Sequence, residues 1–161
     1  MPTWIFPGAY GGGSMKNSLR EQGIFRDKLK SLMLKLNTVF CLAAASVLAA
    51  VHVLSLQFFL YWRYLWLDIP VHILGGAVVA LSIFVPYDFG APLPKRWLNP
   101  VPVLLLVLLV ALSWEVYEIM IGVPFGPDHA ADTFSDLGAG LLGGIAGYFM
   151  SKRLQSLNRA E

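Results

Sequence analysis

The stretch "ADTFSDLGAGLLGG", residues 131–144, decides the fold of this chain, because it joins two aspartates to an apolar run rich in glycine. Residues four apart lie on one face of an α-helix, so Asp132, Asp136, Gly140 and Gly144 would form a single stripe. Small residues at every fourth position let two helix backbones approach closely inside a membrane. The stretch therefore predicts a membrane helix with acidic groups at its start and a packing face below them.

The composition of the whole chain agrees with a membrane protein. Hydrophobic residues make up 57% of it and charged residues only 14%, which is far from the average soluble domain. A membrane helix needs about 20 apolar residues to cross about 30 Å of hydrocarbon. Four segments meet this requirement, namely 36–60, 69–87, 101–121 and 132–150. We therefore expect an all-α membrane protein with a four-helix transmembrane domain over residues 36–150.

The segments outside this domain are short. The sequence "GGGS" at 11–14 is typical of a flexible linker, and Met15 after it reads as a native start, so residues 1–14 are interpreted as a tag and linker. The alternative is a natural N-terminus rich in glycine and proline. Residues 15–35 place apolar side chains among cations near helical spacing, which favours an interfacial helix on the cytoplasmic surface over an ordinary solvated segment. Residues 151–161 are expected to be a cytoplasmic tail.

The basic residues predict the orientation, because lysine and arginine near helix ends gather on the cytoplasmic side. If both termini are cytoplasmic, eleven of the 12 lysines and arginines lie inside and only Arg63 lies outside. Aromatic residues at 61, 62, 64 and 66 would form a belt at the outer interface. The predicted protein is thus multi-pass, with both termini in the cytoplasm.

With this orientation, six of the ten acidic residues and all three histidines fall at the outer end. They include three pairs at helical spacing, one on each of the last three helices. Glu115 is the deepest, roughly 9 Å inside the helix end at 1.5 Å per residue. An ionised carboxylate there costs about 2.5 to 3.5 kcal/mol, so it should be neutral, paired or bound to a metal. The pairs are Asp68 with His72, Glu115 with Glu118, and Asp132 with Asp136.

The stripe of the fourth helix has a counterpart 64 residues earlier in Asp68, His72, Gly76 and Ala80. This spacing favours two parallel helical hairpins related by an axis along the membrane normal, and it requires the second and fourth helices to touch. Chance recurrence of small residues is the alternative. Asp68 and Asp132 also have a simpler interpretation, because each could cap its helix.

The stretches "DIPVHILGG", "WEVYE" and "DTFSDLGAGLLGG" resemble the VanZ-like and YjdF-like families of small bacterial membrane proteins. The resemblance covers about residues 65–147 and falls on Asp68, His72, Glu115, Asp132 and Asp136. A glutamine, an arginine and an asparagine of the VanZ-like pattern are absent, which favours the YjdF-like side. The resemblance implies a bacterial inner membrane protein, and it supplies no agreed reaction.

Carboxylates and imidazole at helical spacings supply the ligands that hard or borderline divalent cations prefer. We expect Asp68, His72, Asp132 and Asp136 to bind Zn, Mn, Fe or Mg, with Glu115 as general base and Glu118 or His129 as accessory groups. The sharper hypothesis is a metal-assisted hydrolase or transferase that acts on lipids or lipid-linked envelope substrates.

Two other functions stay open. The acids and histidines could serve a proton, ion or solute transport component. Alternatively, the protein could be a non-catalytic assembly or regulatory subunit that binds a second copy or another membrane protein through the Gly140/Gly144 and Gly76/Ala80 faces. Membrane lipids are expected partners. Nucleic acid is not, because topology accounts for the basic residues and the net charge is only +2.

Overall fold

The computed structural model describes residues 17–25, 27–28, 36–123 and 128–159. The chain divides into two compact units, Met1–Leu32 and Met33–Glu161. In the first unit, residues 17–25 and 27–28 are helical and exposed. Placement of this helix on a membrane surface stays a prediction. The expected tag and linker, residues 1–14, lie outside the described residues.

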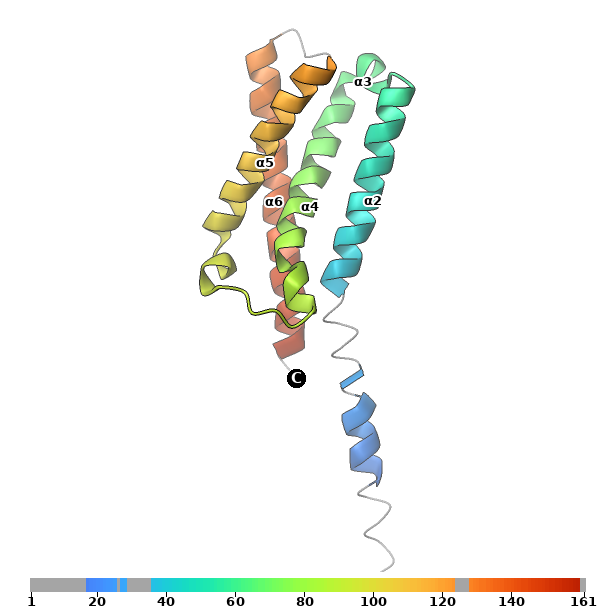
Figure 1. Ribbon diagram of the computed structural model, residues 1–161, viewed down its shortest axis with the longest axis vertical. Helices are drawn as coiled ribbons and strands as arrows, with labels where there is room; N and C mark the ends of the chain where they lie inside the picture. Colours follow the sequence, from blue (N-terminus) through green and yellow to red (C-terminus); the bar gives the residue numbers. More distant parts are fainter. Residues whose placement is uncertain (1–16, 26, 29–35, 124–127, 160–161) are drawn as a thin grey trace, which may run out of the picture. The chain divides into compact units, whose positions relative to one another are not determined.

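The second unit is a bundle of long helices joined by short connections, and the described residues contain no strand (Figure 1). Helices α4 and α6 run in one direction and α2 and α5 in the other. We call the end of the bundle where α4 and α6 begin the site end. The all-α prediction is confirmed. The elements are α2 Leu36–Gln57, α3 Leu60–Arg63, a 3-10 turn Leu65–Leu67, α4 Asp68–Asp88, a 3-10 turn Lys95–Leu98, α5 Pro100–Ile121 and α6 His129–Arg159.

Three helical segments in the described part of the chain are long and apolar enough to cross a membrane: Leu36–Gln57, Leu65–Asp88 and Pro100–Ile121. The predicted spans at 36–60, 69–87 and 101–121 correspond to them. Helix α6 is long enough, but its glycines and aspartates lower its hydropathy. The fourth span therefore stays a prediction, although α6 covers all of 132–150 and extends beyond it at both ends.

Glycines bring the backbones of α4 and α6 into contact. A Cβ atom on Gly76 would lie 1.9 Å from the carbonyl oxygen of Gly140, and one on Gly143 would lie 1.8 Å from that of Ile73. No side chain fits at such distances, so glycine is required at both positions. The second and fourth helices thus touch, as the hairpin repeat requires. The axis that would relate the two hairpins stays a prediction.

The same contacts change the expected use of the small-residue faces. Gly76 and Gly140 face each other, Ala80 is fully buried, and a Cβ on Gly144 would lie 2.9 Å from Val107 Cγ2 of α5. The chain's own helices therefore occupy these faces. A second copy or partner protein would have to bind elsewhere, and such association stays a prediction.

A second polar network, which the sequence did not predict, lies at the end opposite the site. Asn37 Nδ2 donates to the carbonyl oxygen of Leu81 at 3.1 Å, and Ser151 Oγ donates to Asn37 Oδ1 at 2.7 Å. Nearby, Asp88 accepts from the backbone N–H of Thr38 at 2.7 Å. These bonds tie the start of α2 to α4 and α6.

An apolar core separates this network from the site end. Along α6, buried Tyr148 lies between Asp136 and Ser151, and it packs with Phe84 of α4 and Val107 of α5 in one cluster. The polar groups of the bundle are thus divided between its two ends.

Candidate functional site

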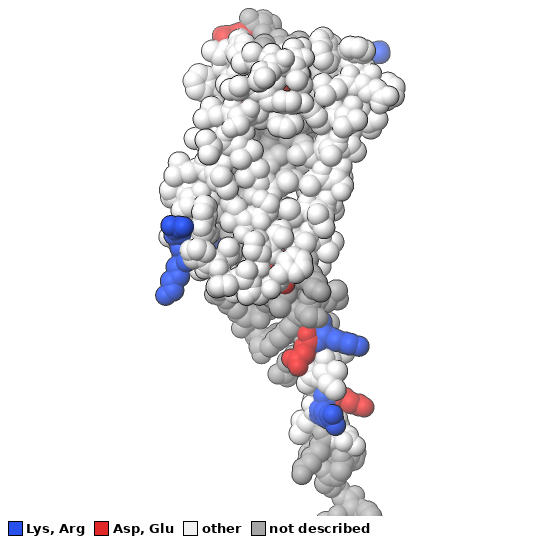
Figure 2. Space-filling model, viewed as in Figure 1, with Lys and Arg blue, Asp and Glu red and all other residues white. Residues whose placement is uncertain are grey.

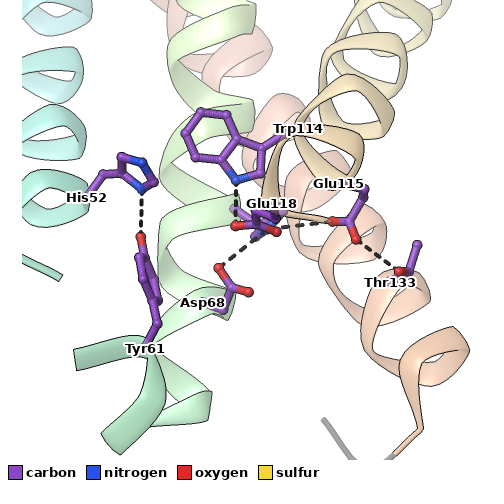
Figure 3. Close-up of polar contacts among 8 residues, drawn as sticks. His52, Tyr61, Asp68, Trp114, Glu115, Glu118 and Thr133 are labelled. Atoms are coloured by element: carbon purple, nitrogen blue, oxygen red, sulfur yellow. Dashed lines mark hydrogen bonds and ion pairs between the residues drawn. The ribbon is translucent and has the colours of Figure 1, made fainter. Parts of the chain in front are cut away.

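His72, near the start of α4, is the centre of the polar cluster at the site end. Its side chain is buried, with 5% of the residue exposed. Its Nε2 atom lies 3.5 Å from Asp68 Oδ1, 3.7 Å from Glu115 Oε1 and 3.7 Å from Glu118 Oε2. Figure 3 shows these three carboxylates, from α4 and α5, pointing into one space. One imidazole nitrogen is therefore surrounded by carboxylate oxygens.

Asp136 reaches the same histidine from α6. Two sets of ligand atoms each lie within 4.8 Å of one another: Asp68, His72 and Glu118, which we call the first group, and His72, Glu115 and Asp136, the second group. Both groups share His72. Side chains of three different helices thus meet, and both members of the Asp68/His72 and Glu115/Glu118 pairs take part, whereas the third pair contributes Asp136.

Two of the seven predicted site residues lie outside these groups. Asp132 is half-buried in the first turn of α6, one turn before Asp136, and His129 is exposed at the start of the same helix. Their predicted roles as a ligand and an accessory group therefore have no support from the geometry. Glu118, predicted only as an accessory group, is in contrast among the most buried side chains, with 2% exposed.

Two hydrogen-bond donors that the sequence analysis missed hold the glutamates in place. Thr133 Oγ1 donates to Glu115 Oε2 at 2.9 Å, and Trp114 Nε1 donates to Glu118 Oε1 at 2.8 Å (Figure 3). Trp114 stands four residues before Glu118, so helical spacing could have found it. Thr133 donates across helices and had no comparable signal. In each glutamate, one oxygen is fixed and the other lies near His72.

Three of the converging atoms have no hydrogen-bond partner among the described residues, although they are buried. They are Asp68 Oδ1, His72 Nε2 and Glu115 Oε1. A buried polar atom without a partner costs about 1 to 3 kcal/mol, and more when the group is charged. A cation in the space between these atoms would satisfy them together.

The alternative interpretation of Asp68 and Asp132 as helix caps is wrong. The N-cap residue of α4 is Leu67, and no side chain caps that helix. At the start of α6, Asp128 does the capping, because its Oδ1 accepts from the backbone N–H groups of Ala130 at 3.1 Å and Ala131 at 3.3 Å. Asp68 is therefore free of a capping role, and its carboxylate faces His72.

An aromatic wall closes the site on the side of α2. The His52 ring lies edge-on to Trp114, with the ring centroids 4.9 Å apart, and its Nδ1 lies 3.0 Å from the Tyr61 hydroxyl (Figure 3). Burial raises the pKa of the Tyr61 phenol, so the hydroxyl stays protonated, and its hydrogen bond with His52 Nδ1 links α3 to α2. The wall holds Trp114, and through it Glu118, in position.

The carboxylates of the cluster have no lysine or arginine partner within the described ranges, where every recorded ion pair of theirs is with His72. The visible face of the bundle in Figure 2 is almost free of lysine, arginine, aspartate and glutamate between its ends. Negative charge is thus gathered inside an apolar bundle around a single imidazole, which is an unfavourable arrangement unless protons or a cation neutralise it.

Comparison with known proteins gives one family. The model of the family described as "Predicted membrane protein (DUF2238)" matches residues 27–156, which include α2 to α5, α6 as far as residue 156, and every residue of the cluster. No curated protein and no solved structure matches the chain.

Proposed function

The chain belongs to the DUF2238 family of membrane proteins, the YjdF-like family that its motifs resemble, and on this premise we propose that it binds a divalent cation beside His72. We further propose that the ion serves a hydrolase or transferase reaction on a lipid or lipid-linked substrate. The family match does not show the VanZ-like resemblance.

The observation that carries the proposal is the set of unpartnered atoms. Asp68 Oδ1, His72 Nε2 and Glu115 Oε1 come from two helices, all three are buried, and each lies within 3.7 Å of another member. A cluster built only for structure would be expected to satisfy its buried atoms with hydrogen bonds. Carboxylate oxygens with one imidazole suit Zn, Mn, Fe or Mg.

The geometry supports a definite division of roles. We assign the first group, Asp68, His72 and Glu118, as ligands, because Trp114 leaves one oxygen of Glu118 directed towards His72. Glu115 is assigned as general base, since Thr133 orients it and its other oxygen adjoins the ion's position. Asp136 completes the shell from α6. This set replaces the predicted ligand Asp132 with Glu118.

In the proposed hydrolysis, Glu115 accepts a proton from a water molecule whose oxygen forms a bond to the phosphorus or carbonyl carbon of the substrate. The bond to the leaving oxygen breaks, and that oxygen takes up the proton from Glu115. Asp68, His72 and Glu118 would hold the cation, which would supply Lewis-acid activation of the attacking water and offset negative charge on the substrate oxygens. A transferase would use an alcohol group in place of water.

A transport role receives less support from the same structure. The polar groups lie at two ends of the bundle with the Phe84, Val107 and Tyr148 cluster between them, so a polar path does not cross the described part of the chain. A one-sided site fits an enzyme at a membrane surface. With both termini in the cytoplasm of a bacterial inner membrane, that site would face outwards.

The proposal is tested by the metal content of the detergent-purified protein, measured by inductively coupled plasma mass spectrometry. We expect near-stoichiometric Zn, Mn or Fe in the wild type and after addition of each metal to chelator-treated protein. The content should fall about tenfold or more in Glu118→Gln and Asp136→Asn, since each loses a ligand or a shell contact.

Asp132→Asn is the matched control, because it makes the same chemical change one turn away on α6 and lies outside both groups. It should retain the wild-type metal content. Absence of metal from the wild type after metal has been added back would overturn the proposal and leave a protonated carboxylate–histidine network. The transport and assembly functions would then be the ones to test.

A further inference from the structure

A cavity of about 140 Å³ lies next to the cluster, between helices α2, α4 and α5. Leu48 of α2, Gly75 of α4 and Val110 and Ala111 of α5 line it, and Gly140 of α6 contributes to its wall. The lining is almost entirely apolar. A cavity with such a lining does not hold water well, because a water molecule needs two to four polar partners.

The cavity shares a wall with the proposed metal site. Among the described residues that line it, His72 and Trp114 are the ones with polar side chains, and both belong to the cluster: His72 is its centre, and Trp114 donates to Glu118. A molecule that filled the cavity would therefore have one end beside the carboxylates and the rest among apolar side chains.

The size and place of the cavity limit the kind of molecule that can fill it. An engineered cavity of about 150 Å³ in another protein holds one benzene molecule, so this cavity has room for about six carbons of a hydrocarbon chain. It lies between helices that are apolar enough to span a membrane, and it is partly open to the surface of the bundle. The solvent at that surface is the acyl chains of the lipids.

We propose that the cavity binds a segment of a phospholipid acyl chain and thereby places the lipid's ester or phosphate group among Asp68, Glu115 and Glu118. The inference deepens the proposed function, on which it rests for the chemistry at the head group. The chain would provide binding energy away from the reacting bonds, and the metal site would act on the polar part.

Gly75 provides a selective test, because a Cβ placed on it meets only Leu48 Cδ2, at 4.0 Å. Because Gly75 lines the cavity, a leucine there would take up part of its volume, and its Cβ would meet no backbone atom within 4 Å. Gly138 is the matched control, since it lies on α6, away from the cavity, and a Cβ on it meets nothing within 4 Å. The variants Gly75→Leu and Gly138→Leu therefore make the same change inside and outside the cavity.

The full chain would be incubated with vesicles of palmitoyl-oleoyl phosphatidylglycerol, purified in mild detergent, and its bound lipid counted by native mass spectrometry. We expect about one tightly held phospholipid in the wild type and in Gly138→Leu. Gly75→Leu should bind the phospholipid with an affinity at least about tenfold lower, which corresponds to a loss of about 1.4 kcal/mol in binding free energy.

A second pair of variants covers the case in which Gly75→Leu does not fold. Val110→Phe adds a ring at a cavity position that is already 40% exposed, whereas Leu109→Phe adds one to the neighbouring residue, which is 61% exposed and outside the lining. Of this pair, Val110→Phe should lose the bound phospholipid and Leu109→Phe should keep it. Equal retention in all four variants, or retention of undecaprenyl phosphate in place of phospholipid when both are supplied, would overturn the inference.

Metal content, measured on the same samples, separates the inference from the proposed function. Gly75→Leu should keep its metal, because no ligand is changed. A protein that holds the phospholipid in a Gly75-dependent manner but never binds metal would refute the metal site and leave the lipid cavity standing. Metal binding without Gly75-dependent lipid binding would refute the lipid cavity and leave the metal site standing.

Discussion

At the scale of single residues, the site depends on neighbours that hold its carboxylates in one orientation. Glu118 receives a hydrogen bond from Trp114, and Glu115 receives one from Thr133. Both leave the second oxygen directed towards His72. Such supporting groups determine how well a ligand presents itself, and losing one typically costs about 10- to 100-fold in metal affinity.

The proposal therefore predicts that Trp114→Phe weakens metal binding by about 10- to 100-fold while the protein still folds. The ring remains, but Glu118 loses its donor. Competition with a fluorescent chelator would measure the dissociation constant. Tyr117→Phe is the control: its ring is tilted against that of Trp114 with the centroids 5.2 Å apart, and within the described part of the chain no hydrogen bond joins its hydroxyl to the cluster. Equal affinities for the two variants would show that Trp114 does not orient a ligand.

At the scale of elements, the site exists because α4 and α6 approach so closely that their backbones are in direct contact. The contacts of Gly76 with Gly140 and of Gly143 with Ile73 fix the distance and the relative height of the two helices. Asp136, four residues before Gly140, is thereby brought to His72, four residues before Gly76. The packing face and the ligand face are parts of one stripe on each helix.

Substitution of adjacent glycines should separate these effects. Gly76→Ala would place its Cβ 1.9 Å from the Gly140 carbonyl oxygen, so the helices must move apart. We expect a loss of about 1 to 3 kcal/mol in the free energy of unfolding, as for other overpacked cores. Gly75→Ala, one residue earlier, meets only open space and Leu48, and it should cost nothing. Unfolding in mixed micelles with increasing sodium dodecyl sulfate would measure both. Equal losses would mean that the close contact is not what stabilises the pair.

At the scale of the whole molecule, the bundle is chemically asymmetric. The carboxylate cluster lies at the site end, while Lys95 and Arg96 before α5 and Lys152 and Arg153 near the end of α6 lie towards the other. Arg63, in α3, is at the site end. Because cations stay on the cytoplasmic side, this distribution predicts that the site end faces out of the cell.

Labelling with a membrane-impermeant maleimide would test the orientation in intact cells. In a background in which buried Cys41 is replaced by alanine, Arg63→Cys should react from outside. Arg153→Cys should react only after the membrane has been permeabilised, and both side chains are exposed enough to be labelled. The reverse pattern would place the site in the cytoplasm and exclude an envelope substrate.

The sequence by itself determined where the helices lie and which residue types gather at the site end, because apolar length and a 3.6-residue period are local properties of the chain. It also placed Asp68, His72, Gly76 and their counterparts on common faces. Only the tertiary structure decided which of these side chains meet, since the period fixes a face but not the height or rotation of one helix against another. That is why Asp132 lies outside both groups although it shares a stripe with Asp136, and why Thr133, whose bond to Glu115 depends on the packing of α6 against α5, became visible only in the folded bundle.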